Sequence, residues 1–331
     1  METTESKIKI VFLISLVIVL AFTFTIWLLA PRLAVFPHLP DQGPAWYYWK
    51  LPHPEFPARI TSWGGYLLHQ IFIWFIVVKV VRRRQNSRNP GHLNNLNIAA
   101  LLGNSAFMFL HLVQTHLFYD GLAQDVPIWS SQYSVIGMLV IILLLLMPRR
   151  GLFWGKLKRL PQNVHGFLRK YHGLYISWAL VYTFWFHPME GDYGILLGFL
   201  YMFLLFIQMS LFNTSLHTNI YWITLLEIFV ALHGTAIAIM NGQSIWPMFL
   251  FGFLFMFVFT QMHGFKLPSW AKIILLVVYL GGFAASYYFR GLGKIYELSF
   301  IPVTLYGVAG ILILLIITGY KLKNFFKTQH V

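Results

Sequence analysis

The 331-residue sequence contains no cysteine. This absence excludes disulfide bonds, thiolate ligands to haem, iron–sulfur clusters and cysteine-based zinc sites. Histidine, which occurs 13 times, is therefore the main candidate for a metal-binding side chain.

Charged residues are also scarce, at 10% of the chain, whereas hydrophobic residues make up 58%. Soluble domains carry about 25% charged residues, so this composition is typical of a membrane protein. The excess of 24 Lys and Arg over 10 Asp and Glu gives a net charge of +14. In a membrane protein this excess indicates basic loops kept in the cytoplasm, so we expect no nucleic-acid partner. No phosphate-binding loop and no G-x-G-x-x-G dinucleotide fingerprint occurs.

Runs of about 20 apolar residues are long enough to cross the hydrocarbon core of a bilayer. Ten such runs cover residues 9–30, 61–81, 96–119, 132–148, 171–188, 192–212, 219–240, 245–262, 271–289 and 299–320. The first exceeds the apolar core of a signal peptide and no A-x-A-like cleavage site follows it, so we interpret it as an uncleaved span. The sequence predicts an all-α, polytopic bundle of about ten transmembrane helices.

The basic residues predict how this bundle is oriented. If both termini are cytoplasmic, only five of the 24 Lys and Arg residues fall in outer segments. These five are Arg32, Lys50, Arg59, Arg290 and Lys294. Because a miscounted span would scramble this split, the pattern favours ten spans with both ends inside, in the cytoplasmic membrane of a prokaryote.

Two loops suggest partners. Outer loop 31–60 is rich in proline and aromatic residues, including the run 46–49, and is interpreted as an interfacial aromatic belt or as a docking surface for a periplasmic partner. Inner loop 149–170 is strongly basic, which fits contact with anionic membrane lipid or with an acidic soluble partner.

Eight histidines lie in or beside the spans. They are His69, His111, His116, His172, His187, His217, His233 and His263. An ionisable group in a span costs about 2.5–3.5 kcal/mol, whereas an interhelical hydrogen bond returns under about 1 kcal/mol. A single buried histidine is usually structural, but so many together favour ligand binding.

Depth in the bilayer limits which histidines can meet. His111 and His187 both lie toward the outer ends of their spans, so they form a candidate ligand pair for an outer haem. His116 is a substitute for His111, because five residues place it about 140° around the helix and both cannot face one iron. His69 is interpreted as a hydrogen-bond partner or a replacement ligand. His172 lies about 22 Å from His187 along a helix and is a candidate inner ligand without an identified partner.

A carboxylate in the middle of span 219–240 supports a different interpretation. Glu227 is either a proton-handling or cation-binding group or the neutral hydrogen-bond partner of a nearby polar side chain. With His217, His233 and His263 it would form a proton or substrate path in a haem-free transporter or channel, with glycine-interrupted helices around Gly242 and Gly264.

Several short motifs resemble a known family. They are LGNSAFMFLH at 102–111, YDGL at 119–122, RRG at 149–151 and RKYHGLY at 169–175. In these motifs residues 96–190 resemble the ferric-reductase-like transmembrane domain of ferric reductases, NADPH oxidases and the bacterial haem subunit of the methionine sulfoxide reductase system. The resemblance implies that His111, His172 and His187 bind haem. The chain departs from the family in the fifteen-residue spacing of His172 and His187 and in lacking a second histidine on the span of His111.

Three segments follow from this comparison. Residues 1–95 hold two spans and the aromatic outer loop, residues 96–190 hold the haem-binding core, and residues 191–331 hold further spans of unknown role. We expect one or two b-type haems that carry electrons from a quinol or a separate flavoprotein to an outer acceptor, as in a membrane oxidoreductase subunit. No catalytic side chain is predicted. A desaturase-like metalloenzyme is disfavoured because His111 and His116 lack H-x-x-x-H spacing, and an acyltransferase or assembly factor remains as a minor alternative.

Overall fold

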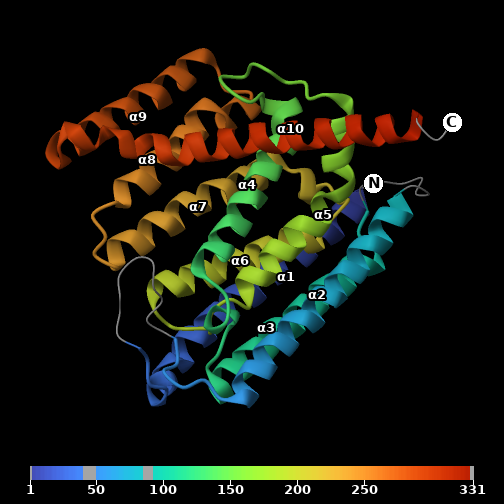
Figure 1. Cartoon of the computed structure of the whole chain (residues 1–331), viewed down its shortest axis with the longest axis vertical. Helices are drawn as coiled ribbons and strands as arrows, with labels where there is room; N and C mark the ends of the chain where they lie inside the picture. The colour runs from blue at the N-terminus through green and yellow to red at the C-terminus, as the bar shows by residue number, and fades with distance from the viewer. Residues whose placement is uncertain (1, 40–49, 85–91, 329–331) are drawn as a thin grey trace. The chain divides into compact units, whose positions relative to one another are not determined.

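The computed structural model describes residues 2–39, 50–84 and 92–328, so the aromatic run 46–49 lies outside the described residues. These residues form ten α-helices joined by short 3₁₀ turns and no β-strand (Figure 1). The helices are α1 Glu2–Leu29, α2 Phe56–Arg84, α3 Asn95–Phe118, α4 Ile128–Arg150, α5 Gln162–Phe184, α6 Tyr193–Ser210, α7 Ile220–Met240, α8 Trp246–Phe259, α9 Ser269–Arg290 and α10 Phe300–Thr328.

Nine of these helices, all except α5, are long and apolar enough to span a membrane, judged on the described residues. The prediction of an all-α multi-pass protein is therefore confirmed. The exception corrects the predicted span 171–188. Helix α5 begins at Gln162 and ends at Phe184, so His187 lies beyond the helix that carries His172. The hydropathy pattern misplaced the start because the first half of α5 is polar and basic, and it misplaced the end because the apolar residues Trp185 and Phe186 follow the helix.

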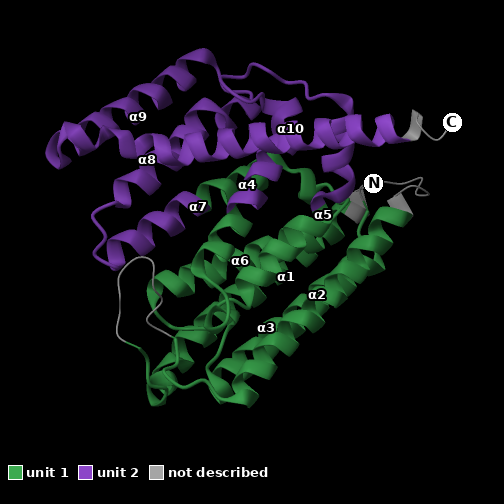
Figure 2. Ribbon diagram, in the orientation of Figure 1, with its two compact units in different colours: residues 1–135, 173–229 green, residues 136–172, 230–331 purple. Residues whose placement is uncertain are grey.

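Two compact units divide the chain (Figure 2). Unit 1 contains residues 1–135 and 173–229, and unit 2 contains residues 136–172 and 230–331. These boundaries differ from those of the three segments that the resemblance suggests. Helices α4, α5 and α7 each contribute to both units.

Unit 1 is built on contacts of α2 with α3, α1 with α6 and α3 with α6, and α2 and α3 run side by side in Figure 1. Asn94 caps α3: its Oδ1 accepts from the backbone N–H of Leu96 at 2.9 Å, and Oδ1 of Asn97 accepts from the backbone N–H of Asn94. This reciprocal cap fixes where α3 begins. The Asn97 amide also donates to the carbonyl of Ser210 at 2.8 Å, which ties the start of α3 to the end of α6.

Unit 2 packs α8 against both α9 and α10. Its core is aromatic and includes Phe251, Tyr279 and Tyr287. The guanidinium of Arg290, at the end of α9, donates to both carboxylate oxygens of Glu297 at 3.0 and 2.8 Å. Because both side chains are largely buried, this bidentate ion pair holds the connection between α9 and α10 in place.

Candidate functional site

A cluster of histidine and aromatic side chains lies inside unit 1, and we call it the histidine–aromatic cluster. It contains His69 from α2, His111 from α3, Phe184 and Trp185 at the end of α5, His187 just beyond, and Phe199 from α6. His69, His111 and Trp185 are completely buried. The sequence predicted that His111 and His187 lie close together, and the structure places both rings against Phe199, at 6.1 and 5.1 Å between centroids.

The segment that follows α5 is held by the turn that follows α3. Backbone N–H groups of Leu122 and Ala123 donate to the carbonyls of Trp185 and Phe186 at 3.0 and 2.8 Å. Gly121 allows this approach, because a Cβ atom there would lie 2.6 Å from the Phe186 carbonyl oxygen. These backbone contacts fix Trp185 and His187 without using their side chains.

Polar side chains secure the same turn on its other side. The Tyr119 hydroxyl donates to the Glu190 carboxylate, and the His38 ring stacks on Tyr119 at 4.9 Å. Asp120 is 1% exposed and accepts from the backbone N–H of Gly121 at 2.7 Å. Burial raises the pKa of Asp120 to about 6. A buried carboxyl therefore titrates at this end of the unit within an ordinary pH range.

His69 has both ring nitrogens engaged. The indole N–H of Trp185 donates to Nδ1 at 3.3 Å, so Nε2 carries the proton and donates to Oδ1 of Asn104 at 2.9 Å. The Asn104 amide in turn donates to the Ser210 hydroxyl at 2.9 Å. This chain of bonds joins four elements and leaves His69 without a free nitrogen for a metal.

The indole ring of Trp185 packs directly against the backbone of Gly65. A Cβ atom on Gly65 would lie 2.2 Å from the indole ring, which is far inside van der Waals contact. The neighbouring Gly64 faces open space. Gly65 is therefore required for the position of the indole, which bonds to His69 and stacks on the His111 ring at 4.3 Å.

His111 differs from His69 in the hydrogen bonding of its ring nitrogens. It is 0% exposed, and neither ring nitrogen has a hydrogen-bond partner within the described part of the chain. Trp185 stacks on its ring and Phe184 meets it edge-on at 4.8 Å. His187 and His69 lie near enough for their charges to act on it. A buried imidazole in this state has its full capacity available for a ligand.

His116 and His172 are each set by a backbone carbonyl. Nδ1 of His116 donates to the Leu112 carbonyl at 2.9 Å, and its Nε2 is buried without a partner in the described residues. Nδ1 of His172, in unit 2, donates to the carbonyl of Leu168 at 3.1 Å. A bond from one ring nitrogen to a carbonyl is a common way to orient the other nitrogen toward a metal.

The residues predicted for a transport path fall into both units. Glu227 is 8% exposed in unit 1, close enough to Tyr201 for electrostatic interaction. His217 lies in a 3₁₀ turn, where it is bonded to the Gln208 carbonyl at 2.8 Å. His233 and His263 belong to unit 2. Nothing within the described ranges brings three His, Asp or Glu side chains together as a metal-ion site.

Two buried glutamines were missed by the sequence reasoning. Gln70 and Gln114 are each 4% exposed, and none of their amide atoms has a partner in the part of the chain that the structure describes. Gln114 lies one helical turn after His111, so a search for polar residues at helical spacing from the histidines would have found it. Gln70 directly follows His69, and helical spacing gives no signal for it.

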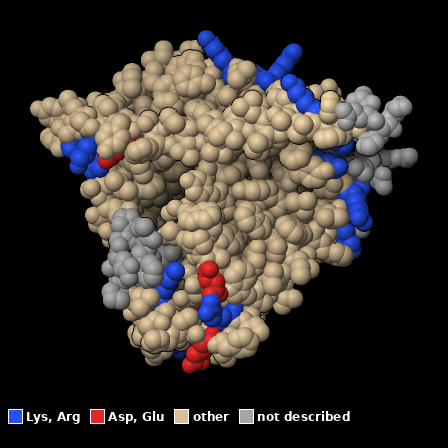
Figure 3. Space-filling view, in the orientation of Figure 1, with Lys and Arg blue, Asp and Glu red and all other residues tan. Residues whose placement is uncertain are grey.

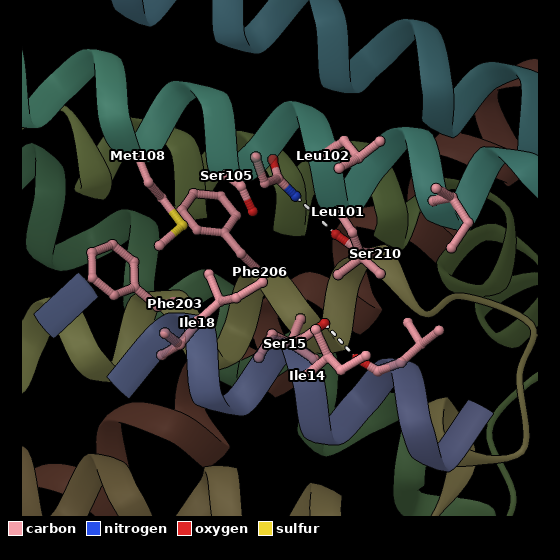
Figure 4. Close-up of a pocket in the computed structure, with 15 residues that line it drawn as sticks. Ile14, Ser15, Ile18, Leu101, Leu102, Ser105, Met108, Phe203, Phe206 and Ser210 are labelled. Atoms are coloured by element: carbon pink, nitrogen blue, oxygen red, sulfur yellow. Dashed lines mark hydrogen bonds between the residues drawn. The ribbon is translucent and has the colours of Figure 1, made fainter. Parts of the chain in front are cut away.

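A cavity of about 170 Å³ lies between α1, α3 and α6 of unit 1 (Figure 4). Its walls are mostly apolar and include Ile14, Leu101 and Phe203. The bond between Asn104 and Ser210 lies at its edge, and the Ser105 hydroxyl faces it. The cavity is thus connected to His69 through Asn104.

The donor chemistry fits a haem at His111 and His187 and does not fit one at His69. His111 offers a buried nitrogen that has no partner among the described residues, His187 meets the same phenylalanine ring, and imidazole nitrogens are common haem ligands. His69 is excluded by its two hydrogen bonds.

The fold and this cluster define an all-helical multi-pass membrane protein with a buried histidine site. No family model, no curated protein and no solved structure matches this chain.

Proposed function

We propose that the protein binds b-type haem through His111 and His187 and transfers electrons across the cytoplasmic membrane to an outer acceptor. The observation that carries this proposal is the state of His111. Leaving a buried polar group without a partner costs about 1–3 kcal/mol, and His111 has two such groups. Ligation to iron would satisfy one nitrogen and give a reason for the residue to be there.

When bound, the haem supplies the one-electron chemistry. The chain's own residues hold and shield it. His111 and His187 would hold the iron, and Trp185, positioned by Gly65 and His69, fixes the orientation of the His111 ring. Phe199 rests against both histidines and would shield the group that they hold.

The electron donor in this proposal is a quinol in the bilayer or a separate flavoprotein that docks at the basic inner loops. The cavity beside Asn104 supports the quinol, because it combines apolar walls with the hydroxyl groups of Ser105 and Ser210 between three candidate spans. His172 remains the proposed ligand of a second, inner haem.

Visible spectra of variants test the ligands. The protein is purified from haem-replete cells, and reduced-minus-oxidised spectra are compared for wild type, His111→Ala, His187→Ala and His233→Ala. His233, half-buried in α7, serves as the control. We expect the first two substitutions to remove or shift a b-type α band and the third to leave it unchanged. Normal haem signals in both His111→Ala and His187→Ala would refute the assignment.

A haem-free transporter is the second candidate, and the burial of Glu227 in α7 favours it. A carboxylate inside a span is commonly part of an ion or proton path. In this case wild-type protein from haem-replete cells would have a featureless visible spectrum, and Glu227→Gln would abolish uptake in proteoliposomes.

A further inference from the structure

Unit 2 has an unusual charge balance. Its sequence holds 14 Lys and Arg residues and one carboxylate, Glu297, which is paired with Arg290. The cations outside the Arg290 region lie at the end of α4 and in the loop after it, in the first half of α5, around the start of α9 and at the end of α10. In Figure 3 blue side chains stand out along the edge that carries the loop after α4 and the start of α9. The charge of these cations has to be balanced from outside the unit.

The loop after α4 contains a tight turn, residues 151–157, that is firmly docked. Gly151, Trp154, Gly155 and Leu157 all have positive φ, and the backbone N–H of Leu152 donates to the Lys156 carbonyl at 2.9 Å. The Leu152 carbonyl accepts from the hydroxyls of Thr260 and Tyr306 at 2.9 and 3.2 Å. The turn is therefore held against the end of α8 and the second turn of α10.

This turn presents apolar and cationic groups side by side. Phe153 is 47% exposed and Leu157 is 64% exposed, and Lys156 between them is also exposed. In a soluble protein such exposed apolar side chains would be unfavourable. At a membrane surface they enter the boundary of the acyl chains while the lysine remains at the level of the headgroups.

His263 packs against the turn, and two lysines, Lys266 and Lys272, lie near it in space or in sequence. The Trp154 ring packs on His263 at 4.9 Å, and a Cβ atom on Gly155 would lie 3.5 Å from Nδ1 of that histidine. Lys272 lies near enough for its charge to act on His263, and Lys266 follows three residues after it. Nε2 of His263 is buried and has no partner in the described ranges, so a hydrogen-bonding atom is still available there.

We propose that this turn, with His263, Lys266 and Lys272, is a binding site for the headgroup of an anionic phospholipid. The lysines and His263 bind the phosphate, and Phe153 and Leu157 contact the acyl chains. A lipid is the occupant rather than a soluble anion because the apolar side chains are exposed beside the cations, at the end of a candidate membrane span. The site is independent of the haem proposal.

The test compares two double variants of the full-length protein that remove the same charge from unit 2. Lys156→Gln/Lys272→Gln removes two cations of the site. Lys321→Gln/Lys323→Gln removes two exposed cations near the end of α10. Each protein is mixed in detergent with phosphatidylglycerol or phosphatidylcholine, and native mass spectrometry measures lipid retention. Thermal unfolding without added lipid checks that both variants are folded.

We expect wild type and Lys321→Gln/Lys323→Gln to retain phosphatidylglycerol in preference to phosphatidylcholine. Lys156→Gln/Lys272→Gln should bind phosphatidylglycerol about tenfold more weakly. Equal losses in the two variants would mean a general charge effect and would overturn the site. Equal retention of the two lipids by wild type would also overturn it, and displacement of phosphatidylglycerol by millimolar inorganic phosphate would show a soluble-anion site instead.

Discussion

Replacing His111 by leucine should stabilise the haem-free protein, although the substitution removes a residue from the proposed functional site. In the structure the His111 imidazole is fully buried, and its two nitrogens have no partners among the described residues. Leucine is close in volume and removes both polar groups from surroundings that include the rings of Phe184, Trp185 and Phe199.

The magnitude follows from the two nitrogens. Each unsatisfied buried group costs about 1–3 kcal/mol, and an imperfect fit of leucine returns at most about 1.5 kcal/mol of that gain. We therefore expect a net stabilisation of about 2 kcal/mol. His69→Leu is the matched comparison, because it removes two hydrogen bonds and leaves Trp185 Nε1 and Asn104 Oδ1 buried and unpaired. That substitution should destabilise the protein by about 2–4 kcal/mol.

The assay is unfolding of detergent-solubilised protein from cells depleted of haem, followed by near-ultraviolet circular dichroism. The two leucine variants should shift the transition in opposite directions. In haem-loaded protein His111→Leu should lose both the haem and its stabilisation. If His111→Leu is as destabilising as His69→Leu in the haem-free state, the His111 nitrogens are satisfied and the reasoning is wrong.

Three further predictions concern neighbouring features. Gly65→Ala should displace Trp185 and lower the thermal midpoint and the haem content, whereas Gly64→Ala, which faces open space, should leave both nearly unchanged; equal effects would contradict the role given to Gly65. Asp120→Asn should stabilise the protein by about 3 kcal/mol at about pH 7.5 and by little at about pH 4. Burial raises the folded-state pKa of Asp120 from 3.8 to about 6, so the charged carboxylate destabilises the folded state as the pH rises through that range. A pH-independent effect on thermal unfolding would disprove this. Glu297→Gln should cost about 3 kcal/mol by leaving the Arg290 guanidinium buried without its carboxylate, and an unchanged thermal midpoint would show that this pair is not stabilising.

The sequence was sufficient for the helices because long apolar runs report directly on membrane spans. Where a helix continues into polar residues the hydropathy signal fails, as in α5, which begins nine residues before the predicted span and ends before His187. The run 132–148 lies inside the longer helix α4, because flanking Ser and Arg residues extend the helix without adding hydropathy.

The candidate site could be predicted only as a set of residue types. Depth in the bilayer, which depends only on position along each span, gave His111 and His187 as a candidate ligand pair; both rings contact Phe199, and their ligation stays a prediction. The difference between His69 and His111 could not be predicted, because it depends on Trp185 and Asn104 reaching His69 from other helices. The turn at Gly121 that fixes the segment after α5 depends on backbone contacts that leave no periodic signal.

The haem content of the purified wild-type protein tests the central claim most directly. Protein produced with excess haem precursor is converted to the pyridine haemochrome, and the haem is counted per polypeptide. The account predicts one or two b-type haems per chain, with loss of at least one in His111→Leu. A wild-type protein that is folded but carries no haem would contradict it.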